Sequence, residues 1–138
     1  MTLFFHQQDD HIYTPIIFTA IGNNAIKFDE GEIINYNHIR LNIGNVFNGN
    51  DGKFTTRLSG IYEFSFLCYT TNIEVMKNDK TEMNLHSSEV VQMGNSFQMA
   101  LNWGDEVYLK AGQGGVYSDE NYSRIFTGKY LRPQWRPV

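Results

Sequence analysis

Hydrophobic and polar residues alternate along most of this chain, in short runs separated by turn residues. The clearest example is GKFTTRLSGIYEFSF, residues 52–66, where Tyr62, Phe64 and Phe66 share one face and polar residues such as Glu63 share the other. Strict alternation over about four to eight residues is typical of a β-strand that buries one face. The pattern therefore predicts strand, turn and strand, with the aromatic side chains in a core.

The same alternation recurs throughout the chain, and no window keeps the spacing and end caps of an amphipathic helix. The absence of a Cys-Trp-Cys pattern argues against an immunoglobulin domain. Short strands with frequent turns predict an all-β jelly-roll sandwich of about ten antiparallel strands. The predicted strands are residues 16–21, 25–28, 39–43, 53–57, 62–70, 73–77, 96–101, 106–110 and 123–131.

The strand around Tyr62 has a second face that is polar only in its middle. Ile61, Leu67 and Tyr69 share the parity of Glu63, so both faces carry apolar side chains toward the strand ends. Burying one large apolar side chain is worth about 1.5–3 kcal/mol, and an exposed apolar face promotes aggregation. We therefore expect this second face to be covered in a homo-oligomer.

Composition narrows the class of protein. The 138 residues suffice for one domain with a proper core. The net charge of -4 and the absence of a Lys/Arg cluster argue against nucleic acid as a partner. The longest apolar stretch, residues 15–20 with its neighbours, is too short to span a membrane. Residues 1–5 lack the basic segment and cleavage site of a signal peptide.

Several motifs then follow one another in a characteristic order. They include Gly-x-Tyr-x-Phe at residues 60–64 and Leu-x-x-Gly-Asp-x-Val-x-Leu at residues 101–109. Taken together, over roughly residues 14–131, they resemble the globular head of the complement C1q family, the relatives of the tumour-necrosis-factor jelly roll. The matching positions are Phe28, Asp29, Asn42, Gly44, Phe47, Gly52, Phe54, Gly60, Tyr62, Phe64, Lys77, Asn78, Leu101, Gly104, Asp105, Val107, Leu109, Tyr117, Tyr122, Ser123, Phe126 and Gly128.

The resemblance implies a compact homotrimer with aromatic side chains packed along its three-fold axis, which would explain the second face. The C1q-like domain is expected at residues 14–132, and the segments outside it are interpreted as an N-terminal arm at 1–13 and a C-terminal tail at 133–138, where two prolines cannot donate to a central strand ladder. The residues expected in the core or the trimer contact are Phe28, Phe54, Tyr62, Phe64, Phe66, Val107, Leu109 and Phe126.

The chain departs from the family pattern in two places. Arg124 and Ile125 put one extra residue into the closing motif, and the segment 78–97 is shorter than is usual. In some relatives that segment supplies calcium ligands. Calcium takes about six to eight oxygen ligands, and the acidic candidates are limited to Asp79, Glu82 and Glu89. No cofactor is predicted, with calcium kept as an alternative.

Sequence motifs for catalysis are missing. There is no Gly-x-Ser-x-Gly, the histidines fit no metal-ligand spacing, and no Lys-Ser/Thr follows GQGG at residues 112–115. Cys68, the single cysteine, shares the parity of the buried aromatics, so we interpret it as a small core residue rather than a catalytic thiol. The prediction is a protein that is not an enzyme.

Two features are candidates for ligand binding. Trp103 lies in the turn NWGD, where it would either pack on a neighbouring loop or present an aromatic platform to a sugar or apolar ligand. Asp119, Glu120, Asn121 and Tyr122 lie in VYSDENYS, which is either a solvated connecting loop or a site for hydroxylated ligands.

These observations favour a secreted, trimeric recognition module that binds extracellular glycans, microbial surfaces or partner proteins, with a lectin-like role in innate immunity. Three sites per trimer would add avidity. Two alternatives stay open: a signalling or scaffold ligand for a receptor, and a matrix protein whose function is trimerisation itself.

Overall fold

The computed structural model describes residues 15–134, and every regular element in that range is a β-strand, as the alternation predicted. Most of the strands are short, whereas β6 and β7 are long. The ten strands are β1 (Ile17–Gly22), β2 (Ile26–Phe28), β3 (His38–Ile43), β4 (Phe47–Asn48), β5 (Lys53–Thr55), β6 (Gly60–Lys77), β7 (Lys80–Leu101), β8 (Glu106–Ala111), β9 (Val116–Ser118) and β10 (Arg124–Arg132).

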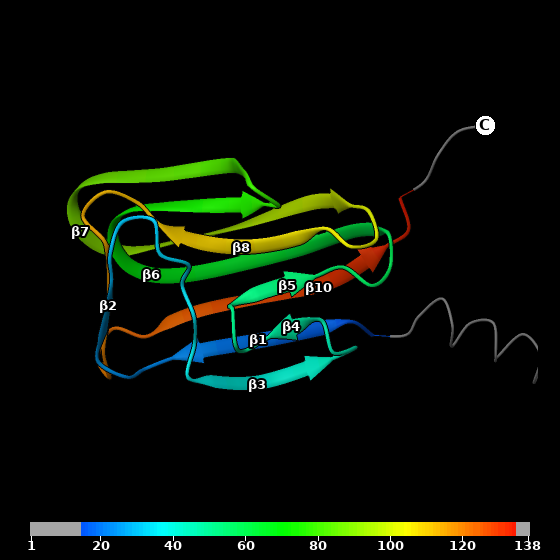
Figure 1. Cartoon of the computed structure of the whole chain (residues 1–138), viewed down its shortest axis with the longest axis horizontal. Coiled ribbons are helices and arrows are strands. Elements are labelled where there is room, and N and C mark those ends of the chain that lie inside the picture. Colours follow the sequence, from blue (N-terminus) through cyan, green and yellow to red (C-terminus); the bar gives the residue numbers. More distant parts are fainter. Residues whose placement is uncertain (1–14, 135–138) are drawn as a thin grey trace, which may run out of the picture.

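The strands form one antiparallel sheet that curls into a jelly-roll-like sandwich (Figure 1). Its order is β3-β1-β10-β6-β8-β5-β4, with β7 and β9 also paired to β6 and β2 paired to β9. The two ends of this path, β3 and β4, are consecutive in the chain. The Asn42 side chain joins them, because its Nδ2 donates to the carbonyl of Phe47 at 2.8 Å. The sheet therefore nearly closes on itself.

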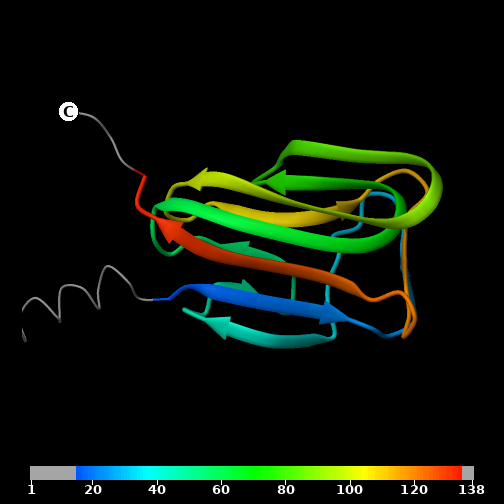
Figure 2. The same cartoon turned by 180° about the vertical axis from the view of Figure 1, so that it is seen from behind.

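The long strands β6 and β7 belong to both layers of the sandwich. The first half of β6 pairs with β10 through Ile61–Leu67, and its second half pairs with β8 through Ile73–Lys77. The register of the β6–β7 pair shifts between Thr70 and Asn72, and Figures 1 and 2 show both strands bending back at this end of the molecule. One hairpin thus connects the two layers.

Strand boundaries are where the prediction needs correction. The expected strands 62–70 and 73–77 are one continuous strand, and residues 80–95, to which no strand was assigned, form most of β7. The short strands β4 and β9 were also missed. Within residues 15–134 β7 pairs with β6 alone, so most of its side chains are exposed and its alternation is weak.

Aromatic rings fill the space between the layers. Phe18 stacks on Phe47 at 4.8 Å and on Phe54 at 5.5 Å between ring centroids, and it meets the edge of Phe126 at 5.1 Å. Such pairs contribute beyond the area that they bury. All eight residues expected in the core or trimer contact have buried side chains in the single chain: Phe28, Phe54, Tyr62, Phe64, Phe66, Val107, Leu109 and Phe126.

The two ends of the described chain lie side by side. The Tyr130 N–H donates to the carbonyl of Ile16 at 2.9 Å, which joins the last strand to the start of the first. Residues 1–13 and most of the expected tail lie outside the described residues, so the domain boundaries stay a prediction. Residues 15–134 contain no helix that is long and apolar enough to cross a membrane.

Candidate functional site

The two candidate sites from the sequence lie at opposite ends of the sandwich. Trp103 belongs to the β7–β8 turn, beside the end of β10. Its backbone N–H donates to Ser59 Oγ at 3.0 Å. Residues 119–122 precede the start of β10, and Figure 1 shows β10 running along the length of the molecule. The structure therefore does not combine these residues into one site.

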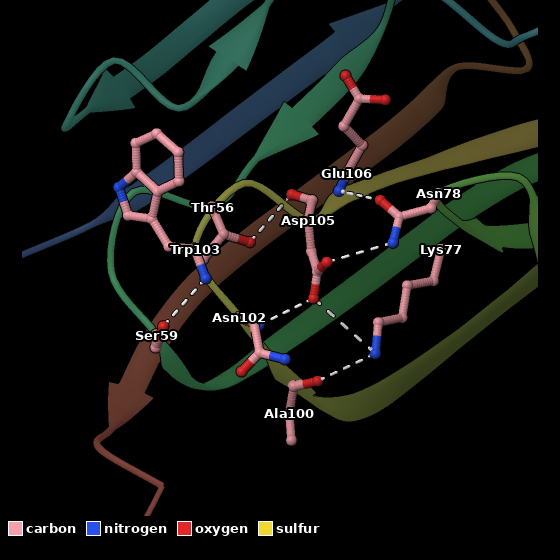
Figure 3. Close-up of polar contacts among 9 residues, drawn as sticks. All are labelled: Thr56, Ser59, Lys77, Asn78, Ala100, Asn102, Trp103, Asp105 and Glu106. Carbon is pink, nitrogen blue, oxygen red and sulfur yellow. Dashed lines mark hydrogen bonds and ion pairs between the residues drawn. The ribbon is translucent and has the colours of Figure 1, made fainter.

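Asp105 holds the turn that carries Trp103. Its Oδ2 accepts the N–H of Asn102 at 2.8 Å, and its Oδ1 accepts Asn78 Nδ2 at 3.2 Å (Figure 3). Gly104 has a φ of +90°, a conformation that costs glycine little. The Gly-Asp pair of the family motif is thus a structural device that closes this turn.

The same turn is tied to the β5–β6 connection. The Thr56 N–H donates to the carbonyl of Asp105, and the Gly104 N–H donates to the carbonyl of Thr56, both at 2.9 Å. In Figure 3 the Trp103 indole points away from this polar cluster, and Trp103 is 73% exposed. The backbone of the turn is therefore held by hydrogen bonds, and the Trp103 indole on it is largely exposed to solvent.

The other candidate loop is stabilised by its own acid. Asp119 Oδ1 accepts the N–H groups of Asn121 and Tyr122 at 2.8 and 2.9 Å. This geometry gives Asp119 a structural role, since one of its oxygens is engaged within the loop. Glu120 and Asn121 are exposed on the same loop.

Tyrosine rings flank that loop, and sequence analysis recognised only part of the set. Tyr122 stacks on Tyr69, with ring centroids 4.1 Å apart. Tyr69 is the cross-strand neighbour of Tyr117, and Lys27 Nζ lies 5.4 Å from the centre of the Tyr117 ring. We call Tyr69, Tyr117 and Tyr122 the tyrosine patch. Cross-strand pairing creates it, so spacing along the chain could not reveal the role of Tyr69 or Lys27.

The second face of the Tyr62 strand continues across its neighbours. Leu67 pairs with Ile125 on β10, and Ile125 pairs with Ile21 on β1. Toward the middle, Ser65 Oγ and Thr127 Oγ1 share a hydrogen bond of 2.7 Å. We call the half-buried apolar residues of this surface the outer face: Ile17, Ile21, Ile61, Leu67, Tyr69 and Ile125.

A groove opens along β7, the strand that pairs with β6 alone in the described range. Met83 and Phe97 line it and pack only partly against the core. Its volume is about 400 Å³. We call it the β7 groove, and its lining residues are Lys77, Glu82, Met83, Phe97, Gln98, Met99 and Ala100.

Neither a metal centre nor a reactive thiol emerges from the geometry of residues 15–134. No group of three or more His, Cys, Asp or Glu in this range could hold a metal ion, so Asp79, Glu82 and Glu89 do not form such a set. Cys68 is buried, and burial raises the pKa of its thiol to about 12. The thiol is therefore protonated at neutral pH and a poor nucleophile.

Sequence comparisons agree with this fold. A family model described as the C1q domain matches residues 17–131. Human complement C1q tumor necrosis factor-related protein 3 is 30% identical over 106 residues, which cover 70% of this chain and 43% of that protein. Mouse complement C1q and tumor necrosis factor-related protein 9 is 33% identical over 118 residues, which cover 77% of this chain and 33% of the relative. The chain spans less than half the length of these curated relatives.

Solved structures show the same architecture. The globular domain of the zebrafish complement 1qA protein superimposes with a TM-score of 0.69 at 17% identity, covering 86% of this chain and 98% of that chain. Murine APRIL superimposes with a TM-score of 0.62 at 12% identity, covering 85% of this chain and 99% of that chain. At these identities the similarity establishes the fold alone.

Proposed function

The chain belongs to the C1q domain family, and we propose that it acts as a homotrimeric recognition module outside the cell. The family is non-enzymatic, C1q/TNF proteins typically assemble as trimers, and C1q/TNF-related proteins are generally secreted. One observation carries the proposal for this chain. It has two different uncovered apolar surfaces, the outer face and the β7 groove.

The difference between these surfaces favours a ring over a two-fold dimer. A two-fold interface uses the same patch on both copies, whereas a head-to-tail interface joins two different patches. A copy that places its β7 groove on the outer face of a neighbour leaves its own outer face free for another copy. Closure of this arrangement after three copies covers every groove and every outer face.

The outer face also carries polar groups that would set the register of the assembly. Ser65 and Thr127 share a hydrogen bond at its centre, and Lys129 pairs with Glu63 at 3.6 Å. Burying such groups is tolerated only when a partner satisfies them. They would therefore favour one arrangement of the copies over sliding along an otherwise apolar surface.

Ligand recognition would use the ends of the sandwich. Tyr117 and Tyr122, the exposed members of the tyrosine patch, lie near Glu120 and Asn121 and offer aromatic faces and hydrogen-bonding groups, which together suit hydroxylated ligands such as glycans. Trp103 offers a single exposed ring at the other end. Each assembly would present three copies of a weak site and gain avidity toward a repetitive surface.

The mass of the full chain in solution tests the assembly. Light scattering is expected to give three times the chain mass of 16.0 kDa. Leu67→Glu on the outer face and Met99→Glu in the groove should each give monomers, because charge opposes burial. Ile26→Glu, where the parent residue is 40% exposed on β2 and lies in neither surface, is the matched control and should stay trimeric.

Mixing the two disrupted variants tests the head-to-tail arrangement. One variant keeps an intact groove and the other an intact outer face, so the mixture should recover a single contact and form a heterodimer. A wild-type chain that stays monomeric at micromolar concentration contradicts the proposed assembly. A wild-type dimer contradicts the closed head-to-tail arrangement of three copies.

A glycan array tests recognition. The wild-type trimer should bind a subset of glycans, and Tyr117→Ala and Trp103→Ala, at opposite ends, identify the end that contacts the ligand. A trimer that binds no glycan contradicts the lectin-like role. That result would favour the alternatives, a ligand for a protein receptor or a structural trimer.

A further inference from the structure

Arg124 is a buried cation at the start of β10, only 2% exposed. Its guanidinium donates to the Asn35 carbonyl from Nε at 2.6 Å, to Ser118 Oγ from Nη1 at 2.9 Å, and to Asn24 Oδ1 from Nη2 at 2.9 Å. A guanidinium has five N–H groups. These three neutral acceptors therefore leave two N–H groups without a partner among residues 15–134.

No carboxylate compensates this charge within the described part of the chain. None of its ion pairs includes Arg124. Two acids of the adjoining loops have other partners, since Asp29 lies 3.5 Å from Lys27 Nζ and Asp119 accepts hydrogen bonds inside its own loop. A buried charge without an opposite charge is costly, so Arg124 is an unusual residue to place here for stability alone.

The guanidinium lies beside an open depression of about 200 Å³. Phe28 and Tyr36 provide aromatic walls, with ring centres 5.1 and 5.9 Å from the guanidinium carbon. Gly22 leaves room for this arrangement, because a Cβ there would overlap the guanidinium. The lining residues are Asn24, Ile26, Phe28, Asn35, Tyr36, Asn37 and Arg124.

Tyr36, whose ring faces the guanidinium, also carries a donor without a partner among residues 15–134. The hydroxyl of Tyr36 is buried without a hydrogen bond in the described chain. Burial raises the pKa of this hydroxyl well above its usual value, so it stays protonated. The depression is thus lined by a guanidinium with two unpaired N–H groups, and no ion pair of the described chain neutralises its charge.

We propose that this depression binds the carboxylate of a sugar acid, such as a uronic acid. Arg124 supplies charge and a planar pair of N–H groups, which match a carboxylate. Asn24 is exposed on the β1–β2 turn. A carboxylate oxygen of the ligand can therefore replace Asn24 Oδ1 as the acceptor of the Arg124 Nη2 hydrogen bond. The site is smaller than the ~300–1,000 Å³ pockets that hold drug-sized ligands, which suits one sugar ring.

The location is compatible with the proposed assembly. Arg124 shares the inward parity of Phe126, whereas Ile125 between them belongs to the outer face. A ligand at Arg124 would therefore not compete with a neighbouring copy. This inference rests on the proposed recognition of glycans, because it names the chemical class of one ligand.

Glucuronate and glucose are the matched probes, since they differ by a carboxylate in place of a hydroxymethyl group. In an NMR titration of the full chain, glucuronate should shift the Arg124 Nε–H signal and bind roughly ten-fold or more tightly than glucose. Equal affinity for both sugars, or no binding of glucuronate, overturns the inference.

A variant at the mouth of the depression tests the location without disturbing the core. Ile26→Glu places a negative charge on a lining residue that is 40% exposed, and should weaken glucuronate binding roughly five-fold. Ile43→Glu, where the parent residue is 41% exposed on β3, should leave the affinity unchanged. Equal effects of the two variants overturn the site.

Arg124→Lys retains the charge but loses the planar pair of donors, so it should also weaken binding. If that variant does not fold, the Ile26 and Ile43 variants decide. Failure here is distinguishable from failure of the proposed function. A trimer that captures neutral glycans on the array but ignores glucuronate contradicts this inference alone.

Discussion

The ring of Tyr69 stacks on the ring of Tyr122, with 4.1 Å between centroids and 11° between ring planes. Tyr69 lies in β6 close to its bend, and Tyr122 lies in the loop before β10. The stack therefore fastens the β9–β10 loop, a candidate ligand-binding element, to the sheet that forms the outer face. Under the proposed function, this pair would connect the outer face, through Tyr69, to the candidate ligand-binding loop, through Tyr122.

Removing the Tyr69 ring should loosen the loop. An aromatic pair contributes about 1 kcal/mol, so Tyr69→Ala should speed hydrogen exchange at the Asn121 and Tyr122 amides roughly five-fold through local opening. Tyr117→Ala is the control, because Tyr117 is a neighbour of Tyr69 but does not stack on Tyr122. Equal acceleration in both variants would show that the stack does not hold the loop.

Tyr62 should contribute to stability mainly through its ring. Tyr62→Phe removes the hydrogen bond from its hydroxyl to the Leu58 carbonyl, 2.6 Å, and should lower the free energy of unfolding by about 1 kcal/mol. Tyr62→Ala opens a cavity in the core and should cost about 3–5 kcal/mol. Urea denaturation measures both values. A wild-type melting temperature for Tyr62→Ala would contradict the core assignment.

Cys68 should make the fold sensitive to alkaline pH. Burial raises the pKa of its thiol from 9.0 to about 12, so the unfolded chain loses this proton at lower pH than the folded chain. The contribution is fully present below pH 9 and is lost as the pH rises toward 12. Unfolding free energies of Cys68→Ala should fall less steeply in this window. Identical pH profiles would rule out this linkage.

The same thiol should resist alkylation in the native protein. Because the thiolate is the nucleophile, iodoacetamide at pH 8 should modify Cys68 only after the chain unfolds. Rapid labelling of the folded protein would contradict the buried, protonated state.

The stability of the β7–β8 turn should depend on the carboxylate of Asp105 and not on the indole of Trp103. Trp103→Ala should change the free energy of unfolding by less than about 0.5 kcal/mol, since the side chain is exposed. Asp105→Ala leaves the N–H of Asn102 without its acceptor and should cost about 1–3 kcal/mol. Asp79→Ala, which removes an exposed acid on a nearby turn, is the control. Denaturation curves that rank Trp103→Ala as the more damaging change would reverse these roles.

Edge strands show where prediction from sequence reached its limit. In β6 the core face from Tyr62 to Phe66 alternates clearly, because both sides of that strand are paired. In β7 the free edge leaves residues such as Glu82 and Gln92 in solvent on both faces. Alternation signals burial of one face, so a strand that buries little carries little of that signal.

The all-β class, the buried aromatic face and the family could be predicted from the amino-acid sequence, because alternation and turn chemistry act between residues close together in the chain. The positions of Trp103 and Tyr122 at opposite ends of the sandwich, and the contact between Tyr69 and Tyr122, could be found in the folded chain alone. The fold also brings Arg124 to Asn24 and Asn35 in two separate loops and to Ser118 at the end of β9. These contacts arise when strands distant in sequence pair side by side, and local periodicity carries no information about such distances.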